Sequence, residues 1–212
     1  LCPPPAGFDR ARRPLVGFLG GAPAASPLPS DLEAWLDAGD PPVHIGFGSM
    51  PLRAAERSLR RVTEAVRSLG LRALVALGWN DLDSDVYQSL GAGADVRVLT
   101  GHVDHAAVFP RCSVVVHHGG AGTTAAVLRA GRPAVVRPVS ADQPFWGRRL
   151  EDVGAGVMLR GDDPTPAVLA AAIESAAARS DAARRVGDAL VDPEDAVARA
   201  ADLVESRIPV AR

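Results

Sequence analysis

The chain has 212 residues, of which 47% are hydrophobic and 23% are charged, and its formal net charge is −2 at pH 7. This composition excludes a wholly disordered chain, and the small net charge excludes a strongly basic surface for nucleic acid. No apolar run approaches the roughly 18 residues of a membrane-spanning helix. Cys2 and Cys112 lie far apart and show no metal-ligand spacing, and they suit a reducing compartment better than a disulfide framework. With no signal peptide visible, we expect a cytoplasmic protein without a metal site.

Short apolar runs alternate with helical patterns along the chain. Three consecutive prolines in residues 1–13 predict an extended linker. Strands are predicted at 15–19, 43–47, 73–77, 96–99, 113–116, 134–136 and 157–159. A short helix should begin at a capping box formed by Ser30 and Glu33 and end near Gly39. Further helices are predicted at 52–69, 122–130, 143–152, 165–178 and 193–206.

This alternation predicts βαβ units and a parallel sheet. The strands lack polar alternation, which is typical of strands buried on both faces. Right-handed crossovers then place helices on both sides of the sheet. The fold class predicted is therefore α/β, a doubly wound, Rossmann-like parallel sheet, formed by one domain over residues 14–212.

The segment from Val114 to Thr124 is the strongest candidate for a ligand site. A buried strand leads into a turn with three glycines, Gly119, Gly120 and Gly122, which allow a ligand to approach the backbone. At the following helix N-terminus, Thr123 and Thr124 offer hydroxyl and N–H groups that suit a phosphate, and His118 adds a donor. The sequence matches neither a Walker loop nor a Gly-x-Gly-x-x-Gly motif. The alternative is a glycine-rich capping turn with a core histidine.

A second polar pair, Asp142 and Gln143, also follows a strand. An acid beside an amide can bind a row of vicinal hydroxyls, because the acid accepts hydrogen bonds while the amide both accepts and donates them. Ligands of open parallel sheets bind beyond the carboxyl ends of the strands, which is where this pair is expected. The alternative for Asp142 is a helix cap.

These stretches resemble a known family. Residues 118–124, His-Gly-Gly-Ala-Gly-Thr-Thr, followed by residues 142–146, Asp-Gln-Pro-Phe-Trp, are similar to the donor-binding signature of the family 1 glycosyltransferases of the GT-B fold. The bacterial and sterol glucosyltransferase branch is the most similar. Residues 46–50 resemble its first diphosphate loop, and residues 103–110 its nucleoside loop. The resemblance extends from about residue 14 to the end of the chain.

The resemblance implies a role for each matching residue. The diphosphate of a UDP or TDP sugar would be bound by Ser49, His118, Gly120, Gly122 and Thr123. The donor sugar would be bound by Asp142 and Gln143. The nucleoside would be bound by Trp79, His102 and Val103, with packing at the rim of the site as the alternative for Trp79. None of the histidines has the context of the family's general base, and His117 is expected to pack or cap at the strand end.

The resemblance covers only the C-terminal half of a GT-B fold. The implied activity is inverting transfer of a hexose to an acceptor hydroxyl, with the base and the acceptor site in an N-terminal domain absent from this chain, and without an obligatory metal or cofactor. The acceptor would be a lipophilic molecule or natural product. The alternatives are a non-catalytic nucleotide-binding module and a sugar-nucleotide epimerase. Three positions depart from the family pattern: Asp104, Ala126 and Arg137, the last expected at a solvent-facing strand end.

Overall fold

The computed structural model describes residues 9, 14–20, 26–48, 55–78, 90, 93–99, 101, 104–161 and 163–207. Every structural statement below refers to these residues. The predicted linker over residues 1–13 lies outside them except for Asp9.

The described strands form one parallel sheet in the order β3-β2-β1-β4-β5-β6. Their bounds are β1 Val43–Gly46, β2 Ala73–Ala76, β3 Val96–Leu99, β4 Val114–His117, β5 Ala134–Val136 and β6 Gly156–Met158. The order reverses between β1 and β4, and in open α/β sheets ligands bind beyond the carboxyl ends of the strands at such a point. In the register of this pair, Gly46 lies beside His117. The predicted doubly wound α/β sheet is confirmed.

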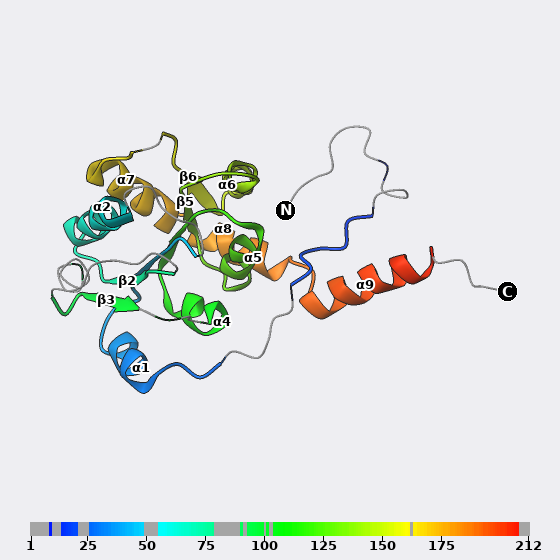
Figure 1. Ribbon diagram of the computed structural model, residues 1–212, viewed down its shortest axis with the longest axis horizontal. Coiled ribbons are helices and arrows are strands. Elements are labelled where there is room, and N and C mark those ends of the chain that lie inside the picture. Colours follow the sequence, from blue (N-terminus) through cyan, green and yellow to red (C-terminus); the bar gives the residue numbers. More distant parts are fainter. Residues whose placement is uncertain are drawn as a thin grey trace.

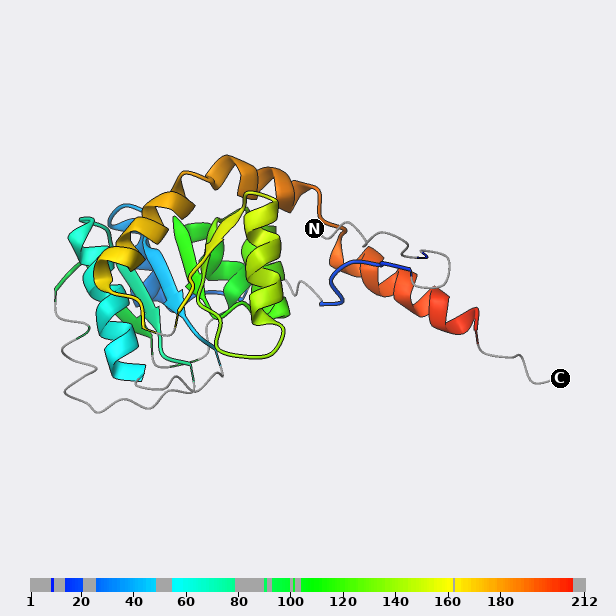
Figure 2. The ribbon, with the colours of Figure 1, turned by 90° about the horizontal axis from the view of Figure 1, so that it is seen from above.

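Helices cover both faces of the sheet (Figures 1 and 2). α2 (Ala55–Ser68) and α7 (Pro166–Ala177) pack on one face. The cluster on the other face includes residues of α1 (Ser30–Asp37), α4 (His105–Val108), the 3-10 turn η1 (Phe109–Arg111), α5 (Ala121–Arg129), α6 (Gln143–Asp152) and α8 (Ser180–Asp188). The last helix, α9 (Pro193–Glu205), extends away from the sheet (Figures 1 and 2).

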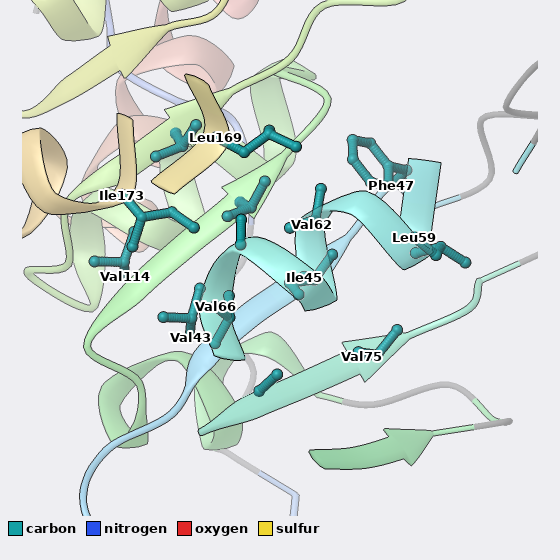
Figure 3. Close-up of a cluster of buried hydrophobic side chains, with 14 of the residues drawn as sticks. Val43, Ile45, Phe47, Leu59, Val62, Val66, Val75, Val114, Leu169 and Ile173 are labelled. Atoms are coloured by element: carbon teal, nitrogen blue, oxygen red, sulfur yellow. The ribbon is translucent and has the colours of Figure 1, made fainter. Parts of the chain in front are cut away.

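Residue spacing explains the core between α2 and the sheet. Leu59, Val62 and Val66 recur at helical spacing and form one buried stripe over β1 (Figure 3). In β4, Val114 and Val116 join this cluster while Val115 joins the opposite one. Successive strand residues thus enter different hydrophobic layers, which is why the strand sequences show no polar alternation. Among the described residues, no helix is long and apolar enough to cross a bilayer.

Three local predictions are wrong. Residues 15–19 form no strand; this run lies along α9, with Gly17 close to Ala196. Ser30 is the first residue of α1 rather than its cap, because the Pro29 carbonyl accepts the first helical hydrogen bonds. Helix α8 was not predicted, since its apolar residues are few and only Ala183 is fully buried.

Candidate functional site

Two turns meet where the strand order reverses. β1 runs into Phe47 and Gly48, and β4 runs into His118. A Cβ atom on Gly48 would lie 3.4 Å from Cε1 of His118, so the imidazole packs directly on the Gly48 backbone. The turn after β2 joins them, since a Cβ atom on Gly78 would overlap the Gly48 carbonyl. The structure therefore brings these turns together at the point where the strand order reverses, which is where open α/β sheets bind ligands.

The N-terminus of α5 presents free donors at this edge. Its cap residue, Gly120, has no side chain to occupy them, and the first helical hydrogen bond runs from Thr124 N to the Gly120 carbonyl at 2.9 Å. The N–H groups of the preceding first-turn residues have no carbonyl within the helix to bond. Gly122 is exposed, and apart from its chain neighbours and the backbone of its own helix no described atom lies within 4 Å of the place where its Cβ would be. This open turn has the donors and the dipole that suit an anion.

His118 is half-buried beside that turn. Its ring lies against Gly120, where an added Cβ would overlap Nε2. Its Nδ1 is buried and has no partner among the described residues. Burial lowers the pKa of His118, and the Asp142 carboxylate acts in the opposite direction. The imidazole is therefore neutral at pH 7 and can donate one hydrogen bond to a ligand.

The neighbouring residues of the turn face the interior. His117 is fully buried and its Nδ1 accepts a hydrogen bond of 3.1 Å from Gly119 N, which confirms its predicted packing and capping role. Burial lowers the pKa of His117 to about 3. Thr124, on the inner side of α5, is also fully buried. The expectation that its hydroxyl serves a ligand is therefore wrong, whereas Thr123 stays partly exposed.

The loop between β5 and α6 is held by Gln143. Its side chain is 4% exposed, and its Oε1 accepts hydrogen bonds from Val139 N at 2.7 Å and Ser140 N at 3.0 Å. Ala141 has a φ of 55°, a left-handed conformation that a non-glycine residue adopts only where its surroundings enforce it. The Gln143 oxygen is thus engaged within the protein, and its amide nitrogen is the group left to donate to a ligand.

Gln143→Ala is expected to lower the free energy of unfolding by about 1–2 kcal/mol, because two backbone donors lose their acceptor. Gln143→Glu is the matched control, since a carboxylate keeps both acceptor bonds and suits the N-terminus of α6. Thermal unfolding measures the difference, at about 2–4 °C for each kcal/mol. Equal melting temperatures for the two variants would contradict the bracing role.

Asp142 is exposed and does not cap α6 with its side chain, so the capping alternative is wrong. Instead, its Oδ2 accepts a hydrogen bond of 2.7 Å from Nε1 of Trp146. Its charge also raises the pKa of His118 against the effect of burial, so the carboxylate lies close enough to the β4 turn to act on that imidazole. The predicted phosphate turn and the predicted hydroxyl-binding residue therefore lie at the same edge of the sheet.

Two of the unusual positions have local roles. Arg137 does not face solvent as expected; it is half-buried and its Nη1 donates a hydrogen bond of 3.1 Å to Ser58 Oγ in the first turn of α2. Asp104 caps α4, accepting from Ala106 N at 2.9 Å and from Ser26 N at 2.7 Å. Both hydrogen bonds lower the pKa of Asp104, and the one from Ser26 has the larger effect. The residue that departs from the family pattern here therefore serves as a helix cap.

Some predicted site residues lie outside the described residues: Ser49, Trp79, His102 and Val103. Within the described part of the chain, no cluster of histidine, cysteine or acidic side chains could hold a metal ion. Cys112 is buried there, and burial raises the pKa of its thiol to about 12. It is therefore an inert core residue.

The chain is similar in sequence to proteins named as glycosyltransferases. The chain is 40% identical over 182 residues to glycosyltransferase GtfE of Amycolatopsis orientalis, covering 86% of this chain and 42% of that protein. It is 43% identical over 128 residues to sterol 3-beta-glucosyltransferase UGT80A2 of Arabidopsis thaliana, covering 60% of this chain and 19% of that protein. The chain thus spans less than half the length of these relatives.

The fold is that of solved GT-B glycosyltransferases. The crystal structure of LpCGTa in complex with UDP matches with a TM-score of 0.68 at 24% identity, over 88% of this chain and 47% of that one. Residues 81–204, more than half of the chain, match the family described as erythromycin biosynthesis protein CIII-like, C-terminal domain. This protein therefore belongs to the family of erythromycin biosynthesis protein CIII-like C-terminal domains.

Proposed function

We propose that this chain is the nucleotide-sugar-binding half of an inverting glycosyltransferase. The observation that carries the proposal is the open N-terminus of α5, which lies beside His118 and Gly48 at the point where the strand order reverses. A relative that is 40% identical over 182 residues is named a glycosyltransferase. A protein of the same fold has been crystallised with UDP. The donor we propose is a UDP or TDP hexose.

Each part of the donor has a chemically suited partner. The diphosphate would lie over the first turn of α5. Its oxygens would accept hydrogen bonds from the N–H groups of Gly122 and Thr123 and one from His118. Asp142 would accept from the sugar hydroxyls, and the Gln143 amide would donate to them. The proposed partners of the nucleoside are Trp79, His102 and Val103, and Ser49 would bind the diphosphate from the opposite turn.

The proposed reaction needs a second domain. A general base there would deprotonate a hydroxyl of a lipophilic or natural-product acceptor, which would then attack the anomeric carbon. The leaving nucleoside diphosphate gains negative charge, and the α5 N-terminus with His118 is suited to stabilise that charge. We therefore propose no obligatory metal. The 212-residue chain alone should bind the nucleotide but transfer little sugar; robust transfer to an acceptor by the purified chain would contradict this division.

Calorimetric titration of the chain with UDP, TDP and GDP tests the proposal. We expect selective binding of UDP or TDP and about tenfold weaker binding by His118→Ala, which loses a hydrogen bond to a charged group. Ser113→Ala is the matched control, because it also removes one side-chain hydrogen bond, that from Ser113 Oγ to the Pro42 carbonyl at 3.2 Å, but lies just before the start of β4, at the opposite end of the strand from this turn. The absence of binding to any of the diphosphates would overturn the proposed site. Product analysis with a nucleotide sugar distinguishes transfer, hydrolysis and epimerisation from simple binding.

Binding should also depend on pH through His118. A bound diphosphate favours the charged imidazolium, so it raises the pKa of His118 from its lowered value in the free protein. Affinity for UDP-glucose or TDP-glucose should therefore increase severalfold as the pH falls from about 8 to 6. A nucleotide sugar is the right probe because its diphosphate diester keeps its charge over this range. A His118→Ala variant with the same pH dependence would exclude His118 as the source.

A further inference from the structure

Asp142 is held by an aromatic cluster that the proposed function leaves unexplained. Its carboxylate accepts from the Trp146 indole at 2.7 Å, four residues further along α6. This is a short hydrogen bond to a charged acceptor, the kind that fixes an orientation most strongly. One carboxylate oxygen is thereby committed to Trp146, while further lone pairs stay available to hydroxyl groups.

Trp146 is itself held from two sides. The Phe145 ring meets the indole edge-on, with centroids 5.1 Å apart, and the Phe18 ring lies 5.2 Å away. Such ring pairs contribute more than the burial of their area alone. Phe18 belongs to residues 14–20, a segment far from α6 in the sequence, and its neighbours Leu15 and Leu19 are 59% and 62% exposed. Within that segment, it is thus the Phe18 ring that packs against α6.

The segment that carries Phe18 is anchored on two other elements. Nη2 of Arg129, at the end of α5, donates a hydrogen bond of 3.3 Å to the Phe18 carbonyl. Gly17 packs so closely on α9 that an added Cβ would lie 3.2 Å from Cβ of Ala196. Both ribbon views show this dark blue segment running beside α9 (Figures 1 and 2). The segment that carries Phe18 is therefore held by contacts with α5 and α9 as well as by the ring contact with α6.

We propose that Trp146 is a positioning residue whose indole N–H orients the Asp142 carboxylate toward the donor sugar, with Phe18 bracing the indole. The inference rests on the proposed function, because Asp142 is its sugar-binding residue. The Trp146 hydrogen bond fixes the carboxylate directly before α6, in the segment that follows the carboxyl end of β5. If Trp146 released it, the side chain would gain rotamers that point into solvent. Recognition of the sugar would then weaken, whereas recognition of the diphosphate, which uses α5, would not.

The test compares nucleotide with nucleotide sugar. Calorimetry gives the dissociation constants of UDP and UDP-glucose, and of TDP and TDP-glucose, for the full chain and for Trp146→Phe, which keeps an aromatic ring but loses the N–H. We expect Trp146→Phe to bind the nucleotide sugar about tenfold more weakly and to bind the nucleoside diphosphate within about twofold of the unaltered chain. Phe18→Ala should also raise the ratio of the nucleotide-sugar dissociation constant to the nucleoside-diphosphate dissociation constant, but by less than Trp146→Phe does.

Trp35→Phe is the matched control, because it also removes one indole hydrogen bond, that from Nε1 to the Ala94 carbonyl at 3.0 Å. It should leave both constants unchanged. The combined effect of Trp146→Phe and Asp142→Asn should be no larger than that of Asp142→Asn alone, since both act on one interaction. A Trp146→Phe variant with an unaltered ratio of the two constants would overturn the positioning role while leaving the nucleotide site intact. If the unaltered chain binds neither ligand, the proposed function fails and this inference fails with it.

Discussion

Lowering the pH from 7 to 5 is expected to reduce the free energy of unfolding by about 4 kcal/mol, roughly 2 kcal/mol from each of two buried histidines. Burial lowers the pKa of His44 and of His117 to about 3, from an ordinary 6.5. The unfolded chain takes up these protons below about pH 6.5, whereas the folded chain does not until about pH 3. Acid therefore favours the unfolded state throughout that interval.

The neighbours of His44 explain why the folded protein resists the proton. The ring meets Phe109 edge-on at 5.0 Å, and the other ring nearby is that of His105, which would repel a charge. Its Nδ1 has no partner among the described residues. Urea titrations at pH 7 and pH 5 measure the effect. In His44→Gln the difference between the two pH values should be about half as large, whatever the stability of the variant. Equal stability of the unaltered chain at both pH values would refute the prediction.

Gly122→Ala is expected to bind UDP or TDP at least tenfold more weakly while unfolding at a higher temperature. The expected stability gain is about 0.5–1 kcal/mol, because alanine has a higher helix propensity than glycine. The added methyl would also meet no described atom within 4 Å outside its chain neighbours and its own helix backbone. The binding loss follows because that methyl occupies the open space over the first turn of α5, where the diphosphate is proposed to lie. Calorimetry and thermal unfolding of the same sample measure both changes.

Gly119→Ala, three residues earlier in the chain, is the matched control for the effect on stability. Gly119 has a φ of 93°, and an added Cβ would lie 2.6 Å from Cγ1 of Val136 and 3.0 Å from the Gln143 carbonyl. Backbone strain and crowding together should lower the free energy of unfolding by about 2–4 kcal/mol. The two variants should therefore move the melting temperature in opposite directions. Unaltered nucleotide binding by Gly122→Ala would show that the diphosphate lies elsewhere.

The strands were predictable from the sequence because their signal is local. A parallel strand covered on both faces is an uninterrupted apolar run, and six of the seven predicted runs are strands within one or two residues. α6 occupies the predicted range of 143–152. The run at 15–19 failed because the same pattern also fits a segment whose aromatic residue packs on a helix, as Phe18 does on Trp146. No pattern within five residues can separate these two outcomes.

The candidate site was predictable as a set of motifs but not as an arrangement of side chains. Glycine, histidine and acid residues after strands mark the ligand edge in any open parallel sheet, so His118, Gly122 and Asp142 were identified without a structure. Their exact surroundings depend on contacts between distant segments. Only the fold shows that Gly48 supports His118 and that Trp146 holds Asp142.

The sequence alone thus determined the fold class and the family resemblance, since both depend on residue types and their spacing along the chain. Tertiary structure decided which member of each adjacent pair is buried and which stays accessible. His117 and His118 are neighbours, yet His117, the last residue of β4, is fully buried, whereas His118 lies just beyond the strand end and is half-buried beside the open turn of α5. Thr124 is buried beside a partly exposed Thr123 because the helix turns by about 100° per residue. The face that becomes interior is set by which strands and helices pack together, and no local sequence signal contains that information.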